Sequence, residues 1–155
     1  MVNLESKPSI KQKLMKLPIK NILKDHELRH TSCREEVLDL FLRRDFALSH
    51  ADLESGISDH FDRVTVYRTL KTFLDAGLIH KVLDDEGVTK YALCREKCSS
   101  AEHHHEHVHF KCTACGQTNC LENVQIPAVK LPEGYRVAET NLLIQGMCRN
   151  CSEMV

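Results

Sequence analysis

Apolar residues in the first half of the chain recur at the three- and four-residue spacing of helices, from Ile19 to Gly77. Ser32 followed by Glu35 has the form of a capping box. An apolar stripe then continues at helical spacing through Cys33, Val37, Leu38, Phe41 and Leu42. We therefore predict a helix that has Ser32 as its N-cap and buries one face.

A pair of helical segments follows. Ser49 with Asp52 predicts the start of a short helix, which Gly56 ends. The next segment reads DRVTVYRTLKTFLDAG over residues 62–77, and one face of it carries Val66, Leu70, Phe73 and Leu74. A short helix, a tight turn and a longer helix form the order of a helix-turn-helix unit.

After Gly77 the pattern changes from helix to strand. The runs LIHKVL (78–83) and TKYALC (89–94) are joined by DDEGV, which suits a hairpin turn, so this hairpin is the wing of a winged helix. Further strands are expected in VHFKC (108–112), QTNCLE (117–122) and YRVAETNLLIQGMC (135–148). The predicted fold is α+β, with an extension over 1–18, a winged helix-turn-helix domain over 19–94 and a small β-rich domain over 95–155.

The composition indicates that metal binding supplements the apolar core. The chain has 155 residues, which excludes a large enzyme scaffold, and its 5% aromatic content without Trp is low for two separate cores. Seven of its eight cysteines and five of its ten histidines lie between Cys94 and Cys151. We find no signal peptide and no apolar run near the roughly 18 residues of a membrane span, so we expect a soluble cytoplasmic protein without membrane contact.

Charge is distributed unevenly. The formal net charge is −1, which argues against general electrostatic binding to nucleic acid. Residues 1–34 nevertheless carry eight Lys and Arg against three Asp and Glu, a difference of +5. A localised basic surface is compatible with this pattern, as is a solvated lysine tail.

Two CxxC pairs are the strongest chemical signal. CTAC supplies Cys112 and Cys115, and CRNC supplies Cys148 and Cys151 after an interval of 32 residues. Zn²⁺ prefers four tetrahedral ligands, with sulfur at about 2.3 Å, and each tight turn presents two thiolates. Disulfides are disfavoured in a reducing compartment, so we predict a closed structural zinc site.

The run HHHEHVHF contains HExxH, formed by His105, Glu106 and His109. That motif needs a helix to serve a metalloprotease, whereas Val108 and Phe110 favour a strand. In a strand, His105, His107 and His109 share one face and Glu106 points to the other. We therefore predict a histidine face that binds metal, with a solvated face as the alternative, and no catalytic residues.

Further ligand types lie in the wing. A hairpin brings His80 in the first wing strand and Cys94 at the end of the second to the same end of the wing. Together with His107 and His109 they would supply three nitrogens and one sulfur, close to what tetrahedral zinc prefers. Cys120 and Glu122 are additional candidates on a later strand.

The longer helix of the helix-turn-helix unit has a polar face. Tyr67, Arg68 and Lys71 lie opposite the apolar stripe, and Arg63 and Thr65 lie in the first turn. Recognition helices present such a face to base edges and phosphates. A solvated helix face would have the same pattern, so this signal is weak by itself.

These motifs in this order resemble the ferric uptake regulator family of metal-dependent repressors. The resemblance covers TVYRTL, DAGLIHKV, YALC, HHHEHVHFKCTACG and GMCRNC, and runs from about residue 20 to the C-terminus. It implies an N-terminal winged helix, a C-terminal α/β dimerisation domain with structural zinc, and a regulatory metal at the hinge. By this resemblance Tyr67 and Arg68 would contact DNA.

Within the family, GLIHKV and YALC are most similar to the zinc uptake regulator branch. This implies that His80, Cys94, His107 and His109 bind the regulatory metal. Iron and peroxide sensors tend to use a histidine where this chain has Ala47. Two departures stand out: Cys120 replaces a frequent acidic ligand, and NVQIPAVKLPEG (123–134) replaces a longer helix.

The expected function is a homodimeric, zinc-responsive repressor of metal-uptake genes that binds a palindromic DNA operator and has no small-molecule substrate. An iron- or peroxide-responsive regulator with regulatory Fe²⁺ is the alternative on the same scaffold. A zinc-stabilised interaction module that binds no DNA is the alternative from another class.

Overall fold

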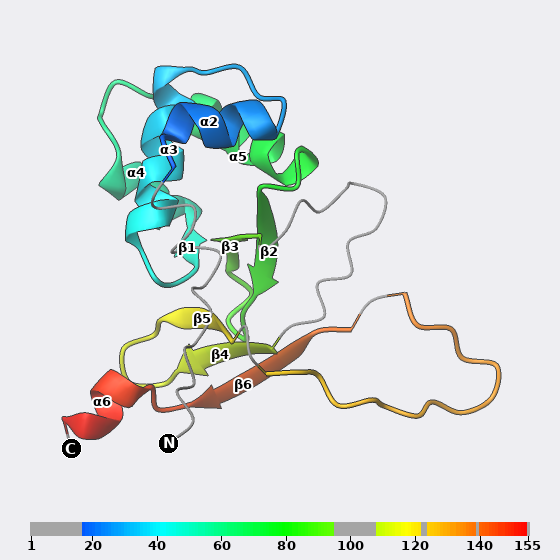
Figure 1. Ribbon diagram of the computed structural model, residues 1–155. Helices are drawn as coiled ribbons and strands as arrows, with labels where there is room; N and C mark the ends of the chain where they lie inside the picture. Colours follow the sequence, from blue (N-terminus) through cyan, green and yellow to red (C-terminus); the bar gives the residue numbers. More distant parts are fainter. Residues whose placement is uncertain (1–16, 95–107, 122–123, 139, 155) are drawn as a thin grey trace, which may run out of the picture.

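The computed structural model describes residues 17–94, 108–121, 124–138 and 140–154. Two parts follow one another along the chain (Figure 1): four helices with a first sheet, and then a second sheet with a terminal helix. The helices of the first part are α2 (Ile19–Asp25), α3 (Ser32–Arg43), α4 (His50–Gly56) and α5 (Arg63–Asp75). Four residues that the sequence analysis singled out lie outside the described residues: His105, Glu106, His107 and Glu122. The same holds for the rest of 1–16, 95–107, 122–123, 139 and 155.

The helix starts are defined by side-chain caps. Ser49 and Asp52 form the predicted reciprocal capping box of α4. The predicted box at Ser32 is wrong by one residue, because Thr31 is the N-cap of α3 and its hydroxyl accepts a hydrogen bond from Arg34 N at 3.3 Å. Thr31 has extended backbone angles, which leaves Ser32 as the first helical residue.

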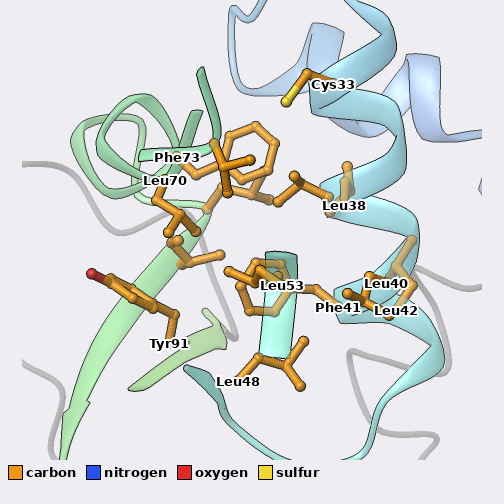
Figure 2. Packing of buried hydrophobic residues seen from close by; sticks show 14 of the residues in the cluster. Cys33, Leu38, Leu40, Phe41, Leu42, Leu48, Leu53, Leu70, Phe73 and Tyr91 are labelled. Atoms are coloured by element: carbon orange, nitrogen blue, oxygen red, sulfur yellow. The ribbon is translucent and has the colours of Figure 1, made fainter. Parts of the chain in front are cut away.

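Helices α3, α4 and α5 enclose the main apolar core. Figure 2 shows side chains from these helices converging, with Phe73 and Leu53 between the elements. The predicted stripe of α5 is confirmed at Val66, Leu70 and Phe73, which are at most 1% exposed. Each such side chain contributes roughly 1.5–3 kcal/mol by leaving water. The core thus fixes which face of α5 remains outside.

The wing is part of a three-stranded antiparallel sheet. Strands β1 (Leu48–Ser49), β3 (Thr89–Leu93) and β2 (Ile79–Leu83) lie in that order, and His80 pairs with Ala92. The connecting turn is closed by Asp84, whose Oδ1 accepts hydrogen bonds from the N–H groups of Glu86 and Val88, both at 3.0 Å. The predicted wing hairpin is therefore confirmed.

The second sheet has the order β5, β4, β6. Strands β4 (Val108–Cys112) and β5 (Thr118–Leu121) form an antiparallel hairpin, and β6 (Leu142–Gly146) pairs with β4 in parallel. A parallel pair needs a long crossover, and the chain between β5 and β6 extends away from the sheet in Figure 1. The prediction of a strand from residue 135 is wrong, since the described residues before Leu142 are not strand. Helix α6 (Arg149–Glu153) is the last element among the described residues.

The two parts contact each other directly. Ala47 N donates a hydrogen bond to the carbonyl of Thr118 at 2.7 Å, which joins the start of β1 to β5. Within the described residues, no helix combines the length and apolar character needed to cross a membrane.

Candidate metal centres and nucleic-acid interface

Four cysteine thiols converge at one end of the second sheet. Cys112 ends β4, Cys115 follows in a tight turn, and Cys148 and Cys151 lie at the start of α6. Their sulfur atoms all lie within 4.8 Å of one another. The turn is closed by Gly116 N, which donates to the Cys112 carbonyl at 2.9 Å, and Gly116 has a positive φ of 74°. The set matches the closed four-thiolate donor set of structural zinc.

Backbone N–H groups prepare this cluster for a cation. Cys115 N and Cys148 N point at the Cys112 sulfur, at 3.5 and 3.3 Å. These hydrogen bonds, the one from Cys115 first, lower the pKa of Cys112 to about 6. The contact of Cys151 with the Cys148 thiol raises the pKa of Cys151 to about 12. Close thiols thus resist ionising together, and a bound divalent cation would favour the loss of their protons.

A second ligand cluster lies between the two sheets. His80 in β2, His109 in β4 and Cys120 in β5 offer ligand atoms that all lie within 4.8 Å of one another. His80 and His109 are buried, at 4% and 6% exposure. His109 and Cys120 are direct partners across the antiparallel β4–β5 pair, which explains how two residues eleven apart meet.

Cys94 reaches the same imidazole from its other side. Its sulfur lies 3.6 Å from His80 Nδ1, whereas the sulfur of Cys120 lies 3.6 Å from His80 Nε2. One metal ion uses one ring nitrogen of a histidine, so the two sulfur contacts belong to different sides of His80. The structure thus brings Cys94 to His80 as the sequence predicts, and it places Cys120 in the three-residue cluster.

Sequence reasoning gave Cys120 as an additional candidate ligand and did not place it in the cluster with His80 and His109. The pair could have been found by counting residues outward from the turn. If strands 108–112 and 118–121 form an antiparallel hairpin, His109 lies opposite Cys120. The protease alternative fails at His109, which lies in strand β4 and not on a helix.

Helix α5 presents an exposed polar face. Asp62 caps it by accepting a hydrogen bond from Thr65 N at 2.7 Å. Hydrogen bonding with the Thr65 side chain, and then with the Thr65 N–H, holds the pKa of Asp62 below its ordinary 3.8. Tyr67 is 58% exposed and Arg68 is also exposed. Of the other predicted contacts, Arg63 and Lys71 are exposed and Thr65 is half-buried.

Two of these cations already contact carboxylates. Arg63 Nε lies 3.4 Å from Glu54 and Lys71 Nζ lies 3.3 Å from Asp75. The Lys71–Asp75 pair is solvent-exposed and Arg63 is exposed beside a half-buried Glu54, so both pairs are weak and phosphates can displace the carboxylates. Val64, 55% exposed beside Thr65, is an apolar member of this surface that sequence reasoning missed.

A winged helix joined to a second sheet that carries clustered metal ligands is the architecture of a metal-responsive transcription regulator. The model of the ferric uptake regulator family matches residues 25–145, and the chain belongs to that family. Members of the family regulate transcription and are not enzymes.

Individual relatives agree with this assignment. The ferric uptake regulation protein of Neisseria gonorrhoeae is 32% identical over 139 residues, which cover 83% of this chain and 90% of the relative. A zinc uptake regulator complexed with zinc and DNA has a TM-score of 0.60 at 22% identity, covering 96% of this chain and 98% of that one. The Vibrio cholerae ferric uptake regulator gives 0.56 at 20% identity, covering 84% and 100%. At these identities the two structures establish the α+β fold alone.

Proposed function

We propose that the protein is a zinc-responsive repressor that binds DNA as a homodimer. The observation that carries this proposal is the cluster of His80, His109 and Cys120. These three residues come from the wing and from the second sheet, so they can surround one ion only while the two parts are in contact. A ligand set of one thiolate and imidazoles favours Zn²⁺ over Fe²⁺, because Fe²⁺ sites more often include carboxylates.

The ligand set would contain His80 through Nε2, His109 and Cys120. His107, two residues before His109, is the proposed fourth ligand. Cys94 would hold the ring of His80 from Nδ1, as partners of metal-bound histidines commonly do. Glu122 is proposed as an additional candidate ligand of this site. The four-cysteine cluster would hold structural zinc and leave no open coordination position.

Regulation would follow from the two-part origin of the hinge ligands. A bound ion shifts a conformational equilibrium by its difference in affinity for the two states. Here the ligands of β2 meet those of β4 and β5 in the joined arrangement alone, which supplies that difference. The joined arrangement would then set the orientation of α5 relative to the second sheet.

The exposed face of α5 would read the operator. Tyr67, Arg68 and the first-turn residues Arg63 and Thr65 would enter the major groove, and Lys71 would contact phosphate. The exposed polar face of α5 supports this role. We propose residues 19–94 as the DNA-binding domain, with residues 1–18 as an extension.

Residues 95–155 would form the dimerisation domain. Large apolar side chains are exposed in its long connection, with Val129, Tyr135 and Val137 between 63% and 70% exposed. Exposed apolar groups that gather in one region indicate a protein interface. A symmetric dimer presents two α5 helices and would require a palindromic operator in metal-uptake promoters. We place this regulator in the cytoplasm, where its DNA would lie.

The test begins with metal content per chain after purification without a tag. A random double-stranded DNA library is then selected with zinc-loaded protein, and the recovered site is titrated with Zn²⁺ and, without oxygen, Fe²⁺. The salt concentration is fixed, because phosphate contacts make affinity strongly salt-dependent. We expect one retained zinc per chain, a palindromic site, and binding that a second zinc induces.

The alternative is an iron-responsive regulator, and the relatives described as ferric uptake regulation proteins favour it. Ala47 argues against it, because this buried alanine offers no ligand atom beside the hinge. Induction of DNA binding by Fe²⁺ alone would establish the alternative. Absence of metal-dependent DNA binding would refute both regulators.

A further inference from the structure

A lysine of the second sheet forms ion pairs with the turn of the wing. Lys111 in β4 places its Nζ 2.6 Å from Asp85, 3.5 Å from Glu86 and 3.7 Å from Asp84. The Lys111 side chain is 9% exposed, so it is largely enclosed by these contacts. A lysine is rarely buried unless its charge is paired. We call Lys111 with Asp84, Asp85 and Glu86 the wing latch.

A second lysine reaches in the opposite direction. Lys90 in β3 contacts Asp84 at 3.6 Å, and its Nζ donates to the carbonyl of Gly116 at 3.2 Å and to the Thr118 hydroxyl at 3.4 Å. Lys111 of the second sheet thus contacts the wing, and Lys90 of the wing contacts the second sheet. The contact of Lys90 with Asp84 lies within the wing, whereas its hydrogen bonds to Gly116 and Thr118 join the wing to the second sheet, as the contacts of Lys111 do.

The wing latch and the hinge cluster lie on the same strand. Side chains of a strand alternate between faces, so His109 and Lys111 point to the same side of β4. His80 lies near the start of the wing hairpin, and the latch carboxylates lie at its tip. The wing is consequently attached to β4 at both ends of the hairpin.

The charge of this turn is wrong for a phosphate contact. Three successive carboxylates at the wing tip would be repelled by the DNA backbone, whereas groove-binding segments carry Lys and Arg. The same carboxylates match a buried lysine well. The turn is therefore better suited to a protein contact than to a DNA contact.

We propose that the acidic wing turn is a docking element for Lys111, and that Lys111 is a positioning residue which fixes the orientation of α5 relative to the second sheet. This rests on the proposed DNA-binding function for its effect on the operator. The effect on orientation does not depend on that function. Without the latch the tip of the wing would lose its contact with Lys111, and the hinge ligands with the contacts near Thr118 would be left to hold the two parts.

The decisive experiment compares operator affinity of the zinc-loaded full chain with that of two variants. Asp85→Asn removes one negative charge from the wing tip and weakens the latch. If the latch positions α5, this variant should lower operator affinity several-fold, although it reduces repulsion from DNA. If the turn lies against DNA, the same change should raise the affinity. An increased affinity would overturn the proposal.

Lys111→Met should lower operator affinity by a similar factor, and the double variant should be no weaker than either single variant, because both changes break one contact. Lys111→Arg should retain most of the affinity. Asp59→Asn is the matched control, since Asp59 is an exposed acid before α5 that belongs to no latch contact. Additive losses in the double variant would contradict a shared contact.

Orientation is measured independently of DNA by residual dipolar couplings of the zinc-loaded protein. The winged helix and the second sheet should share one alignment tensor in the wild type and acquire different tensors in Asp85→Asn. Shared tensors in both proteins would overturn the latch even if DNA binding is confirmed. Separate tensors in a protein that binds no DNA would keep the latch and refute the proposed function.

Discussion

The imidazole rings of His80 and His109 lie 5.7 Å apart with their planes tilted by 41°, although one belongs to the wing and the other to the second sheet. No local feature of either strand creates this pair. It exists because the wing lies against β4, so any ligand that joins the two rings also reports the arrangement of the two parts.

Cys120→Ser should remove the sulfur ligand of the hinge site. We expect a loss in affinity for the second metal larger than the roughly 10- to 100-fold typical of outer-shell changes. The measurement is titration with Co²⁺ of protein whose structural site is filled with zinc, following the sulfur-to-cobalt absorption band. That band should vanish in Cys120→Ser.

Cys94→Ser is the matched variant, because its thiol contacts the other nitrogen of the same ring. It should keep the absorption band and weaken the affinity within the outer-shell range. If Cys94→Ser loses the band and Cys120→Ser keeps it, the ligand set predicted from the sequence is correct and ours is not.

Cys112→Ser should release the structural metal and unfold or dissociate the second part of the chain. Its sulfur receives two backbone N–H groups and ends the central strand of the second sheet. Metal content should fall by one zinc per chain, and sedimentation should show a change in association. Cys33→Ala, at a buried thiol against Thr69 in the first core, should keep both zinc and association state. Retained zinc in Cys112→Ser would disprove the four-cysteine site.

Phe73→Ala should destabilise the winged helix by about 3–5 kcal/mol, because the ring is fully buried and leaves a cavity. Thermal unfolding followed by circular dichroism measures the loss. Tyr67→Ala on the exposed face of the same helix should change stability by no more than about 0.5 kcal/mol. Equal melting temperatures for the two variants would contradict the assigned faces of α5.

Lys71→Ala should weaken operator binding and reduce the slope of log affinity against log salt by about 1, because Lys71 is the proposed phosphate contact. Tyr67→Ala should weaken binding with little change in that slope. Fluorescence anisotropy at several salt concentrations separates the two effects. An unchanged affinity in both variants would exclude this face of α5 from the interface.

Glu36 should make stability depend on pH. It accepts hydrogen bonds from Ser58 Oγ at 2.6 Å and from Ser58 N at 2.8 Å, and these bonds lower the pKa of Glu36 from 4.5. A lowered carboxyl pKa means that the stabilisation is complete above pH 4.5 and is lost as the pH falls through the folded value.

Glu36→Gln should therefore cost about 1 kcal/mol near neutral pH, reduced by solvent exposure, and less in acid. Urea unfolding of wild type and variant between pH 3.5 and 7 (roughly the range over which a carboxyl titrates) measures the difference. A difference that grows toward acid pH would contradict the sign of the shift.

The wing, the helix-turn-helix order and the existence of strands β4 and β5 could be predicted, since each depends on neighbours in sequence. The cap of α3 was misplaced by one residue because Thr31 and Ser32 are both good caps, and the backbone conformation decides between them. The strand expected from residue 135 was too long, because pairing with β4 limits strand β6 to five residues.

The sequence by itself determined the family, the four-cysteine cluster and the faces of α5, because two CxxC turns and an amphipathic stripe express their geometry locally. Only the tertiary structure decided that Cys120 meets His80 and that Lys111 enters the acidic wing turn. Those contacts join residues 40 and 26 positions apart and depend on how one sheet lies on the other. Packing between two sheets leaves no periodic trace along the chain, whereas each strand and helix does.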